Sequence, residues 1–180
     1  MLRKVISGGQ TGSDIGGVMA AKMFGIETGG WMPNGWKTSA GSRPEYRTQY
    51  GMTEHVGDYK ERTRANVEDS DATVRFACYW SSAGERCTKR AILDYDKPYW
   101  DVDVINLASY DWDAPDAVMS CCHPKHFIRW LEEKKVETLN VAGNRQGDFY
   151  SKTGERHTIQ DFVVVYLSYV FRQLGFEKGV

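Results

Sequence analysis

A run of glycines and polar side chains between the first expected strand and the first expected helix carries the strongest chemical signal. It reads Ser7-Gly8-Gly9-Gln10-Thr11-Gly12-Ser13-Asp14. Glycines allow positive φ and a close approach of the backbone, and a helix N-terminus offers N–H groups to anions. We therefore expect Gly8, Gly9, Gln10, Thr11 and Gly12 to bind a phosphate or another oxyanion. A tight turn without a ligand is the alternative, because the run matches neither the dinucleotide fingerprint nor the P-loop.

A second polar cluster lies on the helix expected over residues 58–68. Tyr59, Arg62 and Asn66 are three and four residues apart and therefore share one helical face. A phenol, a guanidinium and an amide together suit recognition of a phosphate or of a polar ring edge. Ser70 and Asp71 follow where the chain enters the next strand. A solvated amphipathic helix is the competing interpretation.

Two more polar clusters follow expected strands. The first has small and hydroxyl-bearing residues before an expected helix: Ser81, Ser82, Gly84 and Thr88. The second has a glycine, an amide and a cation after an expected strand: Gly143, Asn144 and Arg145. The carboxyl ends of parallel strands lie at one edge of a sheet, where ligands bind at a topological switch point. We expect these clusters to share one rim with the glycine-rich turn. For Gly143 and Asn144 an ordinary left-handed turn remains the alternative.

A metal site is not expected at the cysteine- and histidine-containing stretch Cys121-Cys122-His123, with His126 three residues on. The spacing matches no standard zinc pair. His123-Pro124 instead indicates the start of a helix. The G-x-S-x-G elbow and the H-E-x-x-H helix do not occur, so neither hydrolase class is supported.

Strand-like apolar runs alternate with helical patterns, which predicts an α/β fold: one Rossmann-like domain over residues 1–180. Its sheet is expected to be mostly parallel, with helices on both faces. We expect strands at residues 3–7, 28–31, 72–78, 98–102 and 136–142, and helices at 14–24, 58–68, 86–95, 124–135 and 158–174. Residues 32–53 are rich in Gly, Pro, Ser, Thr and Tyr and predict a long irregular segment. Residues 103–122 predict an acidic, aromatic surface excursion with one short helix.

The bulk composition is that of an ordinary globular chain. Over 180 residues the net charge is −1, which argues against a general nucleic-acid binder. No apolar run approaches the roughly 20 residues of a membrane helix. The first residues lack the apolar stretch of a signal peptide, and the four cysteines do not form a disulfide framework. We therefore expect a cytoplasmic protein.

At these residues the chain resembles the molybdenum cofactor carrier family, within the Rossmann-like SLOG and lysine-decarboxylase-like superfamily. The resemblance follows an ordered series: residues 6–14, Gly29-Gly30-Trp31 with Pro33 and Gly35, Gly41, Pro44, residues 59–73, Thr88, Lys97-Pro98 and residues 139–143. It implies a homo-oligomer whose pocket lies between the glycine-rich turn, the helix of Arg62 and Asn66, and the turn before Thr88. It also implies molybdopterin cofactor or molybdate as the ligand, and Trp31 as part of the site.

Two classes of function remain open. As a carrier or sensor, the protein binds a phosphate-bearing molecule, either molybdopterin cofactor or a nucleotide-like ligand. The alternative is a nucleotide N-glycosidase or phosphoribohydrolase acting on a nucleoside monophosphate, with Asp14, Asp71 or Glu85 as the catalytic carboxylate. The related phosphoribohydrolases need a glutamate where this chain has Lys89 and Arg90. A third interpretation is an assembly protein with a vestigial pocket.

Overall fold

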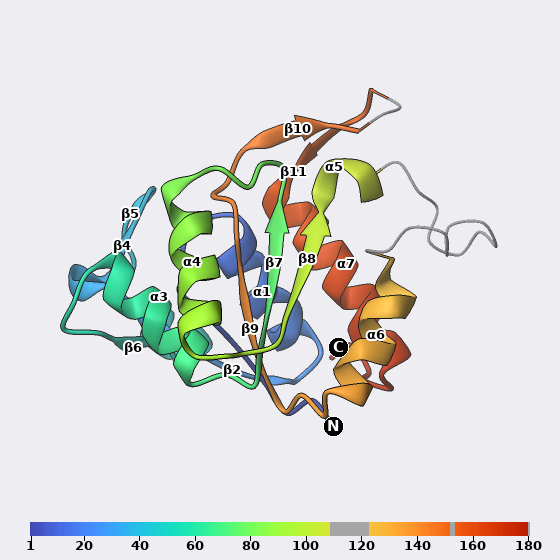
Figure 1. The fold of residues 1–180 in the computed structure, drawn as a ribbon, viewed down its shortest axis with the longest axis horizontal. Helices are drawn as coiled ribbons and strands as arrows, with labels where there is room; N and C mark the ends of the chain where they lie inside the picture. The colour runs from blue at the N-terminus through green and yellow to red at the C-terminus, as the bar shows by residue number, and fades with distance from the viewer. Residues whose placement is uncertain (109–122, 152–153, 180) are drawn as a thin grey trace.

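A parallel sheet forms the centre of the molecule (Figure 1). The structure is a computed structural model that describes residues 1–108, 123–151 and 154–179. Within them, five strands pair in the order β2-β1-β9-β7-β8, and every pair is parallel. The strands are β1 (Lys4–Ser7), β2 (Glu27–Gly29), β7 (Ala72–Ala77), β8 (Tyr99–Asp103) and β9 (Thr138–Gly143). The expected α/β Rossmann-like class is confirmed.

Helices cover both faces of this sheet (Figure 1). They are α1 (Ser13–Met23), α3 (Tyr59–Glu68), α4 (Ala83–Asp94), α6 (Pro124–Glu133) and α7 (Ile159–Gln173). Helices α1, α6 and α7 pack together on one face and α3 with α4 on the other. Two hydrophobic clusters match this division: a large one on the α1 and α7 side, and a small one of Val67, Ala91 and Ile92 between α3 and α4.

Local sequence signals set the helix ends. Asp58 and Glu61 form the reciprocal capping box that begins α3, and the Thr158 side chain accepts the N–H of Asp161 at the start of α7. Helix α4 begins three residues before its expected start, at Ala83. The Ser82 hydroxyl accepts the Glu85 N–H there and caps the helix. The small residues after Ser82, which sequence reasoning assigned to a loop, therefore belong to the first turn of α4.

Short elements fill the connections. Residues 31–54 contain β3 (Trp31–Met32), β4 (Lys37–Thr38), β5 (Gly41–Ser42), α2 (Tyr46–Tyr50), β6 (Thr53–Glu54) and the 3-10 turn Asn34–Trp36. The segment that was expected to be irregular therefore consists of very short strands, turns and one short helix. The short helix expected after β8 is α5 (Val104–Leu107), and residues 109–122 lie outside the described part. A hairpin that sequence reasoning missed, β10 (Asp148–Tyr150) with β11 (Arg156–Thr158), precedes α7.

The strand order creates a crevice. Strand β9 lies between β1 and β7. Helix α1, which follows β1, and helix α4, which follows β7, lie on opposite faces of the sheet (Figure 1). Chains that leave neighbouring strands for opposite faces open a gap at the carboxyl edge, which is where ligands bind in open α/β sheets.

Close packing of α1 on the sheet requires a glycine at position 17. A Cβ there would lie 2.6 Å from the Cβ of Val141 in β9. We predict that Gly17→Ala lowers the free energy of unfolding by about 1–3 kcal/mol, since overpacking outweighs the helix propensity of alanine. The matched control is Gly84→Ala in α4, where a Cβ meets only the Ser82 hydroxyl at 3.8 Å. Urea unfolding should find the control neutral or stabilised; equal effects of the two changes would contradict this packing.

Candidate functional site

A cavity of about 510 Å³ lies at the carboxyl edge of the sheet, between α3 and α4. Its wall comes from the β1–α1 turn, the first turns of α3 and α4, and the residues that follow β9. Ten residues that sequence reasoning named line it: Gln10, Asp14, Tyr59, Arg62, Ser82, Gly84, Thr88, Gly143, Asn144 and Arg145. Segments far apart in the chain therefore meet where parallel topology predicts.

Four N–H groups of the glycine-rich turn already have acceptors within the protein. The Gly9 N–H donates to the Ser7 hydroxyl, the Gln10 N–H to the Asp14 carboxylate, and the Thr11 N–H to the Gln10 side chain. The Ser13 N–H donates to the Asn144 carbonyl. These donors were expected to hold the anion of a ligand, and in the structure they bind polar atoms of the chain itself.

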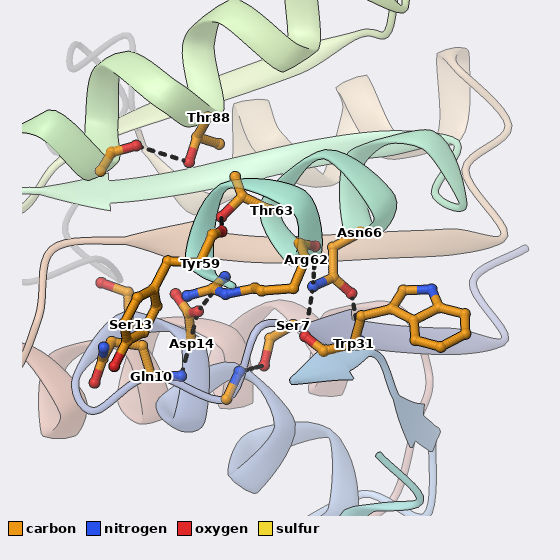
Figure 2. Close-up of polar contacts among 12 residues, drawn as sticks. Ser7, Gln10, Ser13, Asp14, Trp31, Tyr59, Arg62, Thr63, Asn66 and Thr88 are labelled. Carbon is orange, nitrogen blue, oxygen red and sulfur yellow. Dashed lines mark hydrogen bonds and ion pairs between the residues drawn. The ribbon is translucent and has the colours of Figure 1, made fainter. Parts of the chain in front are cut away.

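The negative charge at the start of α1 is the carboxylate of Asp14. Its Oδ2 lies 3.2 Å from Nη1 of Arg62, and both side chains are buried (Figure 2). Arg62 reaches this position from α3 by crossing Gly8, where a Cβ would lie 1.6 Å from Nη1. Gly8 therefore makes room for a side chain of the protein. Burial raises the pKa of Asp14, and the Arg62 guanidinium and the N–H of Gln10 oppose that rise.

Two other glycines of the site also permit close packing. A Cβ at Gly12 would lie 2.4 Å from the Gln146 nitrogen, and a Cβ at Gly9 would lie 2.0 Å from the Met32 sulfur. Both residues have positive φ, of 91° and 66°. Gly8, Gly9, Thr11 and Gly12 thus shape the turn that presents Gln10 and Asp14, and none of the four belongs to the cavity wall.

Asn66, Trp31 and Ser70 hold the protein together outside the cavity. The Asn66 side chain accepts the Trp31 N–H and donates to the Trp31 carbonyl, so it fastens β3 to α3 (Figure 2). The Trp31 indole donates to Asp69 on the surface, at 2.7 Å. The Ser70 hydroxyl donates to the Val67 carbonyl. The side chains of Asn66 and Ser70 thus satisfy backbone groups of the fold, and that of Trp31 bonds another side chain.

Asp71 lies at the opposite edge of the sheet. It precedes β7, and its carboxylate accepts the N–H groups of Glu137 and Thr138 at the start of β9. The cavity lies beyond the other ends of these strands, so Asp71 stands apart from it. Ser81 lies beside the wall, and its carbonyl accepts from Arg86.

Asn144 joins the three segments that surround the cavity. Its Oδ1 accepts the N–H groups of Cys78 and Tyr79, and its Nδ2 donates to the Tyr79 carbonyl and to Glu85 at 3.0 Å. Its backbone carbonyl accepts from Ser13 of α1. The preceding Gly143 has a φ of 147°, and a Cβ there would lie 2.0 Å from the Phe76 carbonyl oxygen. Asn144 therefore orders the wall, with its side-chain groups already bonded.

Glu85 is a buried carboxyl beneath the cavity wall. Burial raises its pKa to about 7, whereas Arg75 and the Asn144 amide act to lower it. Oε2 of Glu85 lies 3.5 Å from Nη1 of Arg75, whose other nitrogens form a two-pronged pair with Asp101 at 2.8 and 2.6 Å. The short contacts of Arg75 go to Asp101, and Glu85 has the longer one.

The open side of the cavity is electropositive. Lys60 and Arg145 line it, and neither forms an ion pair with any residue in the described ranges. The N–H groups of Ala83 and Gly84, in the first turn of α4, have no acceptor among those residues either. The rings of Tyr59 and Tyr79 stand beside these donors, with the Arg145 guanidinium 5.9 Å from the Tyr59 ring centre.

Sequence reasoning missed six residues of the wall: Lys60, Thr63, Tyr79, Ala83, Cys87 and Ala142. Thr63 is four residues after Tyr59 on the same helical face, so its position could have been inferred. Tyr79 lies two residues after the end of β7, and the rule that sites form after parallel strands would have found it. Lys60 and Cys87 carry no distinguishing spacing.

A family model and a solved structure match this chain. The model, described as the circularly permutated YpsA SLOG family, matches residues 5–162. The chain belongs to this SLOG family. The crystal structure of "Putative molybdenum carrier protein" from Syntrophus aciditrophicus SB is 30% identical, with a TM-score of 0.74 over 94% of each chain. Curated proteins gave no significant match. The resemblance to molybdenum carriers inferred for this SLOG chain from its motifs is confirmed.

Two expectations concern features outside this site. His123 is buried and caps α6 by accepting the Lys125 N–H, as its position before Pro124 predicts, while Cys121 and Cys122 lie outside the described residues. In the described part, no helix combines the length and the apolar character that crossing a membrane requires.

The buried pair of Asp14 and Arg62 predicts a strong mutual dependence. Arg62→Met leaves a buried carboxylate unpaired and should lower the free energy of unfolding by about 3–5 kcal/mol. Asp14→Asn should also destabilise, and the double variant should recover part of the loss because it removes both charges. A double-mutant cycle by urea unfolding measures this coupling. Single changes that each cost under about 1 kcal/mol would contradict a structural role for the pair.

The raised pKa of Glu85 predicts a pH-dependent stability. Glutamate normally releases its proton near 4.5, and folded Glu85 keeps it to about pH 7, so folding binds a proton in this window. Its contribution is therefore full below pH 4.5 and is lost as the pH rises towards 7, by roughly 3 kcal/mol at most. Urea unfolding between pH 5 and 8 should find a shallower decline for Glu85→Gln than for the native chain. Parallel curves would contradict the raised pKa.

Proposed function

We propose that this protein is a carrier or sensor that binds a small molecule with an oxyanionic group and an aromatic ring. The observation that carries this proposal is the cavity between α3 and α4. It is lined by two tyrosine rings, and by two cations and N–H groups that have no partner in the described part of the chain. Charge-assisted hydrogen bonds are the strong ones, and anions favour helix N-termini. This donor set suits phosphate or molybdate.

The charge balance supports an anionic ligand. Asp14 is the one carboxylate among the described residues of the wall, and its charge is opposed by Arg62. Lys60 and Arg145 are therefore in excess. The Nε of Arg62 is also buried without a hydrogen-bond partner in the described residues, which leaves a polar atom unsatisfied beside the cavity.

Size and aromatic character support a ring-bearing ligand. Ligand cavities commonly enclose about 300–1,000 Å³, and this one encloses about 510 Å³. Tyr59 and Tyr79 offer ring faces on which a pterin or a purine can stack. Molybdopterin cofactor combines such a ring with a phosphate, and a nucleotide does so as well.

The similarity to a molybdenum carrier favours the molybdenum ligands within this class. Cys87 is the one thiol of the wall in the described residues, and burial raises its pKa. A protonated thiol is a poor metal ligand. The residues therefore fit a molybdenum oxyanion or a cofactor phosphate held by N–H groups and cations, without a thiolate bond from this chain.

A nucleoside-monophosphate N-glycosidase is the second candidate, because a carboxylate, Asp14, lines the cavity. General acid–base chemistry needs such a group within reach of the leaving base or the attacking water. Chromatography of a panel of nucleoside monophosphates incubated with the protein tests this reaction. Free base released by the native chain, and lost in an Asp14→Asn variant whose thermal unfolding shows that it is folded, would establish the enzyme. Absence of base with every member would leave the carrier.

The proposal includes one domain over residues 1–180, a homo-oligomeric assembly and a cytoplasmic location. These points rest on composition and on the resemblance to carriers. Light scattering coupled to size-exclusion chromatography measures the assembly, and a mass near 20.5 kDa would exclude the oligomer.

The cations Lys60 and Arg145 of the cavity wall should determine affinity. We predict that Arg145→Gln and Lys60→Gln each weaken binding of 5′-AMP or molybdate by about 1–2 kcal/mol, since each removes a charge-assisted contact. Isothermal titration calorimetry measures the dissociation constants. Arg172→Gln, an exposed residue in the last turn of α7, is the matched control and should bind as the native chain does. Equal affinities for all four proteins would remove the cavity as the binding site.

A further inference from the structure

The side-chain oxygen of Gln10 accepts several hydrogen bonds, whereas its side-chain nitrogen has no acceptor among the described residues. Oε1 accepts the N–H of Thr11 at 2.9 Å and the N–H of Ser39 at 2.8 Å. Both partners are backbone donors, so the atom that faces them must be the amide oxygen, and the orientation of the amide is fixed. The Ser39 hydroxyl adds a third bond at 3.0 Å.

The opposite end of the amide is available to a ligand. Gln10 is 5% exposed and lines the cavity, and its Nε2 donates to none of the described residues. The buried side-chain atoms that lack a partner do not include Nε2, so this nitrogen remains accessible. A buried amide with a fixed oxygen and an unused donor is a ready recognition group, because no rotation is needed to present it.

Ser39 belongs to a preorganised hairpin. It lies in the turn between β4 and β5, where the Thr38 hydroxyl donates to the Gly41 carbonyl and accepts the Ala40 N–H. Its own hydroxyl lies 2.6 Å from that of Thr11. The hairpin thus holds the glycine-rich turn through Gln10 and Thr11, from a segment 28 residues further along the chain.

We infer that Gln10 is a ligand-reading amide that donates from Nε2 to a hydrogen-bond acceptor on the ligand, and that Ser39 is its positioning residue. This inference rests on the proposed function, because it places the ligand in the same cavity. The acceptor is either an oxyanion oxygen or an oxygen or ring nitrogen of the organic part. The β4–β5 hairpin, which has no residue in the wall, sets the affinity through Gln10.

Calorimetry with 5′-AMP, 5′-GMP, inorganic phosphate and molybdate tests the inference. Gln10→Met keeps the side-chain volume and removes the donor, so it should weaken binding about fivefold or more, the equivalent of about one neutral hydrogen bond. Ser39→Ala should weaken binding about two- to threefold. Ser39→Thr keeps the hydroxyl and should restore native affinity. Gln173→Ala, on the exposed end of α7, is the control.

The probes separate the two sources of the acceptor. A loss that phosphate and molybdate share with the nucleotides identifies the oxyanion, and a loss confined to the nucleotides identifies the organic part. Unchanged affinity of Gln10→Met for every probe that the native chain binds would overturn the inference and leave the proposed function intact. Failure of the native chain to bind any probe would overturn both. Thermal unfolding of each variant ensures that binding is compared between folded proteins.

Discussion

The anion at the start of the first helix is part of the protein, and this constraint shapes the rest of the site. The Asp14 carboxylate accepts from Gln10 and from Arg62, and the guanidinium lies against Gly8. A buried charge is tolerated only with such partners. Because Arg62 must reach across from α3, this ion pair ties the second layer of helices to the glycine-rich turn. A carboxylate of the chain thus stands where a helix N-terminus favours an anion, and within the described residues the donors without acceptors lie at α4 and after β9.

Asn144 fixes the relative positions of the segments that form the cavity wall. One side chain satisfies the N–H groups of Cys78 and Tyr79 and donates to Glu85, while its backbone holds Ser13. The ends of β7 and β9 and the first turns of α1 and α4 are therefore fixed relative to one another. The cavity follows from strand order, since α1 and α4 leave the sheet on opposite faces.

Much of the architecture could be predicted because it depends on local sequence patterns. Apolar periodicity located the strands of the sheet and the long helices, and caps such as Asp58 with Glu61 placed their ends. The very short strands of residues 31–54 escaped, because two residues carry no periodicity. The rim was predictable from parallel topology. What sequence could not decide is whether a glycine clears space for a ligand or for the chain itself. That depends on contacts such as Gly8 with Arg62, 54 residues away, and Gln10 with Ser39, 29 residues away.

Ligand binding should therefore perturb the backbone amides at the start of α4 and after β9 more than those of the glycine-rich turn. Backbone amide chemical shifts, followed by NMR while 5′-AMP or molybdate is added to the ¹⁵N-labelled protein, measure this directly. We expect the largest shifts at Ala83, Gly84 and Arg145, with Gly9 nearly unchanged because its N–H already donates to the Ser7 hydroxyl. The largest shift at Gly9, with Ala83 and Gly84 unmoved, would contradict this placement of the ligand.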